Sequence, residues 1–237
     1  NADFSNGKIG WTDTNFNNPD KNPKVYEAYA GWGSLDVTSY CIKQDVPMPA
    51  GTYRLDAFGF FRYGENYSEA PEKSAAYLRV GENNVLVKTL ASEVTGETAA
   101  NNTDDASEAF KAGKYLNSIE FTLPEEQIVS IGFDGTFEVM KSWFIGGTFK
   151  LYAIDEVARK NSINKVKKEL EDVVASYTLP QGFMKTVNEV YDKIDNMGGT
   201  DEELDEAGNL LLGKKTEALQ MIEACKEYET YYEFCIG

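Results

Sequence analysis

Histidine is entirely absent from this 237-residue sequence. Without an imidazole the chain cannot perform the Ser–His or Cys–His nucleophilic mechanisms, and it cannot bind a metal ion through histidine. Cysteine is scarce as well, and the three that occur are Cys41, Cys225 and Cys235. An odd number at these spacings indicates neither a disulfide framework nor a zinc site. We therefore expect three buried thiols without a metal role.

Long apolar runs and an excess of positive charge are also missing. No stretch approaches the roughly 20 apolar residues that span a bilayer, so we expect no membrane insertion. Lys and Arg number 23 against 39 Asp and Glu, a net charge of −16 that repels phosphate backbones, so we expect no nucleic-acid partner. The sequence begins at Asn1 and shows no signal peptide, which is compatible with removal of a leader.

Aromatic residues, by contrast, are abundant at 13% of the chain, and they favour both β-sheet cores and sugar-stacking surfaces. Through residues 1–153, short β-branched and aromatic runs alternate with clusters of Gly, Asn, Asp and Pro. Eight of these runs are predicted to be strands: 25–30, 36–44, 52–62, 75–80, 85–90, 118–123, 127–133 and 148–154. This many short strands predicts a β-sandwich. The polar segments 64–73 and 96–113 are expected to be long loops within it.

After Ile154 the spacing of apolar residues changes from a period of 2 to a period of 3.6, which predicts helices. Leu179-Pro180 and Gly198-Gly199 separate three amphipathic segments, and Thr200 with Glu203 forms a capping box before the third. Short connections predict an antiparallel three-helix bundle at 154–237. The apolar stripes are expected to form its core: Val157, Val166, Leu170, Val173 and Tyr177; Phe183, Val187, Val190, Tyr191 and Ile194; Leu204, Leu211, Ala218, Ile222 and Cys225 towards Tyr232. The fold class is therefore mainly β plus α.

Several motifs in the β part, taken in their order along the chain, resemble the galactose-binding-like jelly rolls, the β-sandwiches typical of carbohydrate-binding modules. They are Asn1–Phe4 with Gly10-Trp11, Pro49–Leu55 followed by Phe60–Arg62, Ala109–Tyr115, Val129–Phe133, and Trp143 with Gly147–Tyr152. The resemblance covers residues 1–153 and implies a jelly roll there. It also implies a non-catalytic sugar-binding module of a secreted or cell-surface glycan-utilisation protein, a setting common in gut bacteria.

Many related jelly rolls hold a structural calcium ion, and here the resemblance has a departure. Asp3 offers a carboxylate, but Gly147-Thr148 stands where the family often carries Asp-Asn. Because calcium prefers several oxygen ligands, the loss of that pair weakens the site. We therefore predict no cofactor, with a structural calcium ion near Asp3 as the alternative.

A sugar-binding site needs an exposed aromatic ring for the apolar C–H face of the sugar and polar side chains for its hydroxyl groups. Segments near the strand ends offer both, in six candidate residues: Trp32, Arg62, Tyr63, Asn66, Tyr67 and Trp143. The aromatic rings would stack on the sugar, and Arg62 with Asn66 would supply hydrogen bonds. The flanking glycines and charges favour exposure of Trp32, Tyr63 and Tyr67. Trp143 suits a core position equally well, and Trp11 is expected in the core.

Two further functions compete with sugar binding. Glycosidases use a pair of carboxylates, but with 39 acidic residues such pairs arise by chance, so we expect no enzyme. The alternative is a structural or protein–protein interaction module, in which the sandwich is a spacer. The helical bundle would then dock a protein partner or a neighbouring domain, with the aromatic stretch 228–235 as one contact. Aromatic candidates packed inside the core would favour this second function.

Overall fold

A computed structural model describes residues 8–17, 25–65, 74–93, 100–196 and 199–236, and for 228–236 it describes the backbone only. The chain divides into two compact units. A sandwich unit contains Asn1–Met48, Tyr53–Thr122 and Glu126–Tyr152. A helical unit contains Ala153–Gly237 together with two short pieces, Pro49–Thr52 and Leu123–Glu125.

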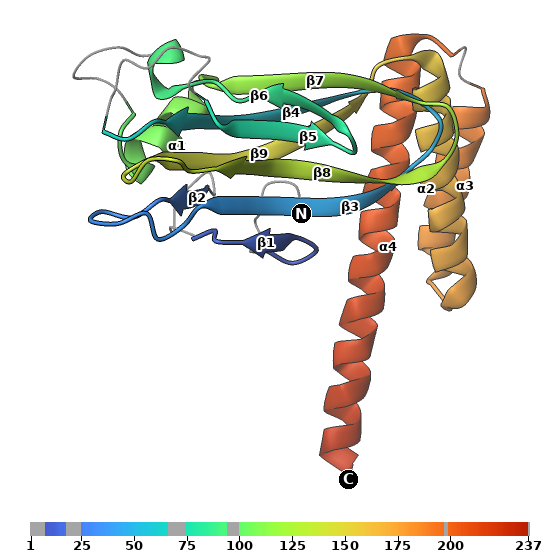
Figure 1. Ribbon diagram of the computed structural model, residues 1–237. Coiled ribbons are helices and arrows are strands. Elements are labelled where there is room, and N and C mark those ends of the chain that lie inside the picture. Colours follow the sequence, from blue (N-terminus) through green and yellow to red (C-terminus); the bar gives the residue numbers. More distant parts are fainter. Residues whose placement is uncertain (1–7, 18–24, 66–73, 94–99, 197–198, 237) are drawn as a thin grey trace. The chain divides into compact units, whose positions relative to one another are not determined.

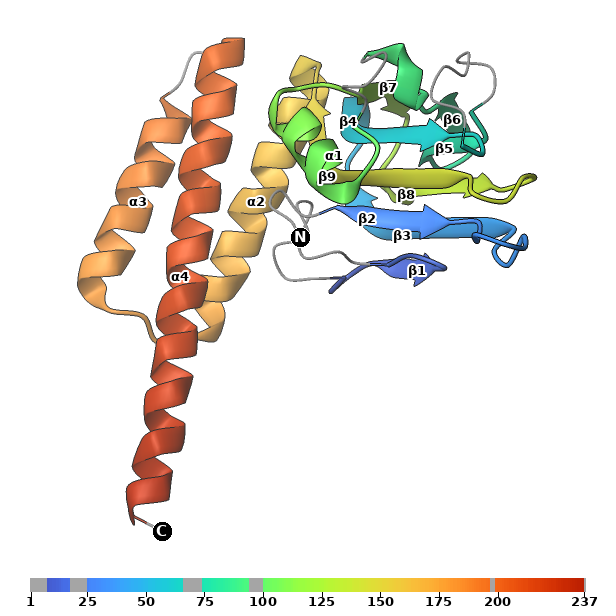
Figure 2. The ribbon, with the colours of Figure 1, turned by 90° about the vertical axis from the view of Figure 1, so that its left-hand side faces the viewer.

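Two antiparallel sheets form the sandwich unit (Figures 1 and 2). The five-stranded sheet has the order β1 (Thr12–Thr14), β3 (Ser39–Met48), β8 (Gln127–Thr136), β5 (Ala76–Val80) and β6 (Asn83–Leu86). The four-stranded sheet has the order β2 (Tyr26–Tyr29), β9 (Trp143–Ala153), β4 (Gly51–Arg62) and β7 (Leu116–Leu123). The prediction of a β-sandwich followed by helices is confirmed.

Aromatic rings from both sheets meet between the layers. The ring centroid of Phe133 on β8 lies 5.1 Å from that of Phe144 and 5.0 Å from that of Phe149, both on β9. Trp11 joins them at 4.7 Å from Phe149 and is 8% exposed, so its predicted core position is confirmed. Strand β4 lies inside its sheet between β9 and β7; both of its faces carry apolar side chains, and its Phe60 is fully buried.

The predicted loop 96–113 contains a helix instead, α1 (Thr103–Lys111). The Asn102 side chain caps it by accepting a hydrogen bond from the Asp105 amide, and acidic residues fill its first turn. Ala106 and Phe110, four residues apart, bury one face. The polar composition of the segment hid this short amphipathic pattern. A 3₁₀ turn, η2 (Leu90–Ser92), likewise replaces the end of the predicted strand 85–90.

The helical unit contains α2 (Glu156–Ser176), α3 (Gln181–Asp195) and α4 (Asp201–Ile236), which lie side by side (Figure 2). The predicted capping box is present: the Thr200 amide donates to Glu203 Oε2 at 3.0 Å, and the Glu203 amide donates to Thr200 Oγ1 at 3.3 Å. The core is built from the predicted stripes, with Leu170, Val187, Leu211 and Ala218 fully buried. None of the described helices is both long enough and apolar enough to cross a membrane.

Some predicted core residues are exposed. Val157 is 57% exposed in the first turn of α2, and Tyr177 is 44% exposed just beyond the end of that helix. Cys225 is exposed, and the prediction of a buried thiol there is wrong; among the described side chains of α4, Ile222 is the last that is buried. Cys41 is only half-buried, because it alternates along β3 with the buried side chains of Tyr40 and Ile42. The side chains of Tyr232 and Cys235 lie outside the described residues.

Asp155 connects the start of α2 to Thr52 at the start of β4. Thr52 belongs to the helical unit, as α2 does. Its Oδ1 accepts a hydrogen bond from the Ala158 amide at 2.6 Å, which caps the helix. Its Oδ2 accepts one from the Thr52 amide at 2.9 Å. Hydrogen bonds from Thr52, and then from Ala158, lower the pKa of Asp155. The carboxylate is therefore stabilised in the folded state relative to the unfolded state.

Asp155→Ala should lower the free energy of unfolding of the helical unit by about 1 kcal/mol at pH 7, the usual cost of losing a helix cap. Because the folded pKa is depressed, the contribution of Asp155 is present above its unfolded pKa of about 3.9 and is lost as the pH falls through the folded value. The difference between wild type and variant should therefore shrink below about pH 4. Denaturant unfolding followed by circular dichroism at several pH values measures this.

The matched control is Asp192→Ala, which removes an exposed carboxylate from the last turn of α3. It should leave the unfolding free energy nearly unchanged. The assigned role of the carboxylate would be contradicted if the loss of unfolding free energy in Asp155→Ala stayed constant from pH 7 to pH 3.

Candidate ligand-binding site

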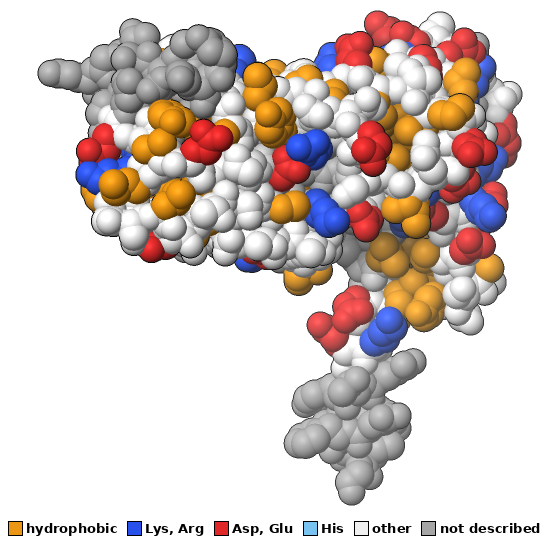
Figure 3. Space-filling view, in the orientation of Figure 1, with side chains coloured by type: hydrophobic (Ala, Val, Ile, Leu, Met, Phe, Trp, Pro, Cys, Tyr) orange, Lys and Arg blue, Asp and Glu red, His pale blue; other side chains and the backbone are white. Residues whose placement is uncertain are grey.

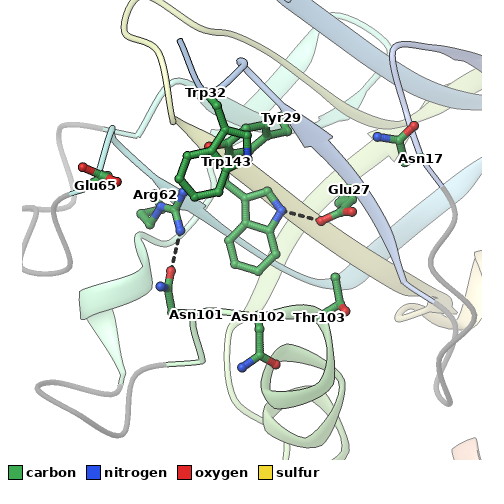
Figure 4. A pocket seen from close by; sticks show the side chains of 10 residues that line it. All are labelled: Asn17, Glu27, Tyr29, Trp32, Arg62, Glu65, Asn101, Asn102, Thr103 and Trp143. Carbon is green, nitrogen blue, oxygen red and sulfur yellow. Dashed lines mark hydrogen bonds between the residues drawn. The ribbon is translucent and has the colours of Figure 1, made fainter.

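A pocket of about 470 Å³ opens in the sandwich unit (Figure 4). Its lining comes from β2 and the segments that flank it, the end of β4, the start of β9 and the start of α1. The residues are Asn17, Glu27, Tyr29, Trp32, Arg62, Glu65, Asn101, Asn102, Thr103 and Trp143. The set combines three aromatic rings, one of which is a phenol, with three amides, one aliphatic hydroxyl group, two carboxylates and one guanidinium group.

Trp32 is the exposed ring of this pocket, with 71% of its surface accessible. It follows Gly31, whose φ of +113° lets the chain turn sharply after β2. The Lys141 amide donates a hydrogen bond to the Gly31 carbonyl at 2.8 Å, which ties this turn to the segment before β9. The Trp32 ring centroid lies 5.8 Å from that of Tyr29 and 5.5 Å from Lys141 Nζ. The turn therefore holds a large apolar ring facing solvent.

Arg62, at the end of β4, is buried and joins three segments of the pocket wall. Its Nε donates to the Gly64 carbonyl at 2.9 Å, one Nη donates to Asn101 Oδ1, and the other Nη donates to the Lys141 carbonyl at 2.7 Å. Its guanidinium carbon lies 5.4 Å from the centroid of the Trp143 ring. Arg62 therefore joins these three segments of the wall through its hydrogen bonds.

Trp143 belongs to the inner wall of the pocket, since only 4% of its surface is exposed. Its Nε1 donates a hydrogen bond to Glu27 Oε2 at 2.7 Å, and its ring packs edge-on against Phe60 at 5.3 Å. Strand pairing places it opposite Tyr29 in β2. The sequence left Trp143 open between core and platform, and the structure places its ring in the core with one edge at the pocket.

The start of α1 supplies the amide side of the pocket, which the sequence did not predict. Asn102 Oδ1 accepts from the Asp105 amide at 2.9 Å, and its Nδ2 donates to Asp105 Oδ2 at 2.7 Å. Asn101, one residue earlier, is held by Arg62. The run Asn-Asn-Thr-Asp-Asp at 101–105 is a helix-start signal that could have indicated this side. Across the pocket, the Asn17 backbone pairs with that of Glu27.

The candidate residues predicted from sequence have different positions. Trp32, Arg62 and Trp143 converge on the one pocket. Tyr63 is half-buried and does not line it. Asn66 and Tyr67 lie outside the described residues, as does Asp3, on which the calcium alternative depends. Within the described ranges, no group of three or more His, Cys, Asp or Glu side chains could hold a metal ion.

Charge at the rim comes from Glu65 and Lys141, which form an ion pair at 2.8 Å. Beneath them, burial raises the pKa of the Tyr29 phenol, and the positive charges of Arg62 and Lys141 offset part of that rise. The Tyr29 phenol therefore stays protonated at neutral pH and presents an uncharged ring below Trp32.

Neither a protein-family model nor a curated protein matches this sequence. Solved structures that resemble it include a family 61 carbohydrate-binding module in complex with β-1,4-galactotriose, 16% identical, with 65% of this chain and 96% of that chain covered at a TM-score of 0.41. A family 16 carbohydrate-binding module is 15% identical, covering 64% and 96% at 0.39. A family 35 module from Clostridium thermocellum is 14% identical, covering 62% and 95% at 0.32. All three are carbohydrate-binding modules, the class that the sequence motifs resemble.

Gly31→Ala should destabilise the turn that carries Trp32. The backbone at this residue has a positive φ, and an added Cβ would lie 2.3 Å from the Ser34 carbonyl oxygen and 2.7 Å from Asp36 Oδ2. We expect a loss of about 1 kcal/mol or more in the free energy of unfolding of the sandwich unit, measured by denaturant titration.

The neighbouring Gly33→Ala is a matched control, since its φ is not positive and no atom lies within 4 Å of an added Cβ. It should leave the unfolding free energy within about 0.5 kcal/mol of wild type. Equal losses in the two variants would show that Gly31 has no special conformational role.

Proposed function

We propose that the sandwich unit is a non-catalytic carbohydrate-binding module of a secreted or cell-surface glycan-utilisation protein. The observation that carries this proposal is the exposed Trp32 ring at the edge of a pocket lined with amides and carboxylates. A sugar presents an apolar C–H face and a ring of hydroxyl groups, and this pocket offers a partner for each.

The bound sugar would stack its apolar face on Trp32. Its hydroxyl groups would reach the amide and hydroxyl side chains of Asn17, Asn101 and Thr103 on the opposite sides of the pocket (Figure 4). An amide both donates and accepts hydrogen bonds, as a hydroxyl group does, so the two groups pair without a net charge. The site is open to solvent, so affinity should be modest, because little area is buried and the ligand must be ordered.

Both carboxylates of the pocket are used as acceptors, which supports binding without catalysis. Glu27 accepts the indole N–H of Trp143, and Glu65 is paired with the ammonium group of Lys141. A glycosidase of the usual kind needs one carboxyl group that donates a proton to the leaving oxygen and a second that acts as base or nucleophile. The secreted or cell-surface setting is where a module of this kind meets polysaccharides.

A specific observation favours the interaction module as a second candidate. Leu212 and Leu219, two helical turns apart on α4, are 53% and 47% exposed. Figure 3 shows hydrophobic side chains gathered on the surface of the helical unit. A helix that exposes two leucines on one side suits contact with a protein partner or a neighbouring domain.

Trp32→Ala should weaken glycan binding at least about tenfold, which corresponds to losing roughly 1.4 kcal/mol of stacking and burial. A glycan array of plant, mucin and microbial polysaccharides first identifies the ligand of the wild type. Isothermal titration calorimetry then compares the variants. The matched control is Ile128→Ala on β8, because Ile128 is also 71% exposed but does not line the pocket.

Three results are distinguishable. Loss of binding in Trp32→Ala with retention in Ile128→Ala supports the proposed site. Full retention in Trp32→Ala moves the site elsewhere on the protein. A folded wild-type protein that binds no glycan overturns the carbohydrate-binding function and leaves the interaction module as the stronger candidate.

A further inference from the structure

The two carboxylates of the pocket are compensated to different degrees. Glu65 pairs with Lys141, but the only described contact of the Glu27 carboxylate is with the neutral indole N–H of Trp143. Indole N–H donation satisfies an oxygen lone pair without cancelling its charge. Among the described side chains that line the pocket, Glu27 therefore adds a negative charge with no cation as its partner.

Arg62 is the one cation among the described lining residues, and each of its three guanidinium nitrogens already donates a hydrogen bond to the wall. A guanidinium group binds a carboxylate well when two parallel N–H groups are available on one edge. In Arg62, Nε and both Nη atoms already donate to Gly64, Asn101 and Lys141. A ligand carboxylate that took two parallel N–H groups would share nitrogens that already hold the wall.

Lys141 is also engaged. Its ammonium group lies 2.8 Å from the Glu65 carboxylate and 5.5 Å from the Trp32 ring centroid. An acidic sugar stacked on Trp32 would compete with Glu65 for this ammonium group while facing the charge of Glu27. The net charge of −16 adds a long-range repulsion of polyanions.

We infer that the pocket selects uncharged glycans and disfavours those that carry carboxylate or sulfate groups. The inference rests on the proposed carbohydrate-binding function and names the ligand class of the same site. The charges held in the wall determine the selectivity: Glu27 repels an anion, and the positive groups of Arg62 and Lys141 already have partners in the protein. Hydroxyl groups, which both donate and accept, can pair with Glu27 and the amides without meeting a like charge.

The test compares a neutral glycan with a charged form of the same glycan. The glycan that the wild type binds on the array is compared, by isothermal titration calorimetry, with the same glycan after oxidation of its primary alcohols to carboxylates. We expect array hits dominated by neutral glycans, and at least about tenfold weaker binding of the oxidised form, because the ligand charge meets Glu27 in a partly desolvated pocket.

Charge-removing variants separate electrostatics from shape. Glu65→Gln removes a negative charge and releases the Lys141 ammonium group, and Glu27→Gln removes a charge while keeping an oxygen that can accept from Trp143. We define the charge ratio as the affinity for the oxidised glycan divided by the affinity for the neutral glycan. Each variant should raise this ratio by roughly two- to fivefold, the range expected for partly exposed charge interactions. Glu120→Gln makes the same change in net charge at an exposed position on β7 outside the pocket, and it should leave the ratio unchanged.

The outcomes are separable from those of the proposed function. The selectivity is supported if the array identifies neutral glycans and if the affinity for the oxidised glycan relative to the neutral one rises in the Glu65 and Glu27 variants only. Array hits dominated by uronate, sialate or sulfate glycans, or ratios that match the Glu120 variant, overturn it while leaving carbohydrate binding in place. A folded protein without any glycan ligand overturns both.

Discussion

The buried guanidinium of Arg62 carries a charge that must be met by hydrogen-bond acceptors, because an unpaired charge inside a protein is very costly. The acceptors are the Gly64 and Lys141 carbonyls and the Asn101 side chain, which come from three segments far apart in the sequence. Satisfying one side chain therefore fixes the end of β4, the segment before β9 and the start of α1 together. Removing that side chain would take away one contact from each of the three segments, so the shape of the pocket depends on it.

The pocket has a rigid inner layer and an exposed outer layer. Strand pairing of β2 with β9 sets Tyr29 opposite Trp143, and the Trp143 indole then anchors Glu27. Above this layer, the Gly31 turn lifts Trp32 into solvent. Ordering the inner layer during folding means that a ligand needs to order little more than Trp32 and the rim charges. Preorganisation of this kind would lower the entropic cost of ligand binding at an open site.

The elements were predictable because their patterns are local. Alternation along Ser118–Leu123 and the capping box at Thr200 each reflect neighbours within a few residues, and both are found as expected. The site was predictable in part only. Exposure of Trp32 follows from adjacent glycines, but the burial of Trp143 depends on Phe60 and on Glu27, 116 residues away. The α1 start was missed because its burial, through Ala106 and Phe110, is a tertiary effect that a polar composition conceals.

The inner residues and the rim residues of the pocket differ in how far they can be changed. The inner residues also belong to the aromatic core, so changing them disturbs the packing of the sandwich. The rim residues, by contrast, are placed by backbone contacts: Lys141 by its amide and carbonyl, and Trp32 by the turn before it. Their side chains can therefore change without loss of the fold. Because Glu65 and Lys141 cancel each other at that rim, replacing either one alters the charge that a ligand meets and leaves the Arg62 framework intact. In the proposed site, the charge that a ligand would meet therefore depends on these rim residues together with Glu27 of the inner layer.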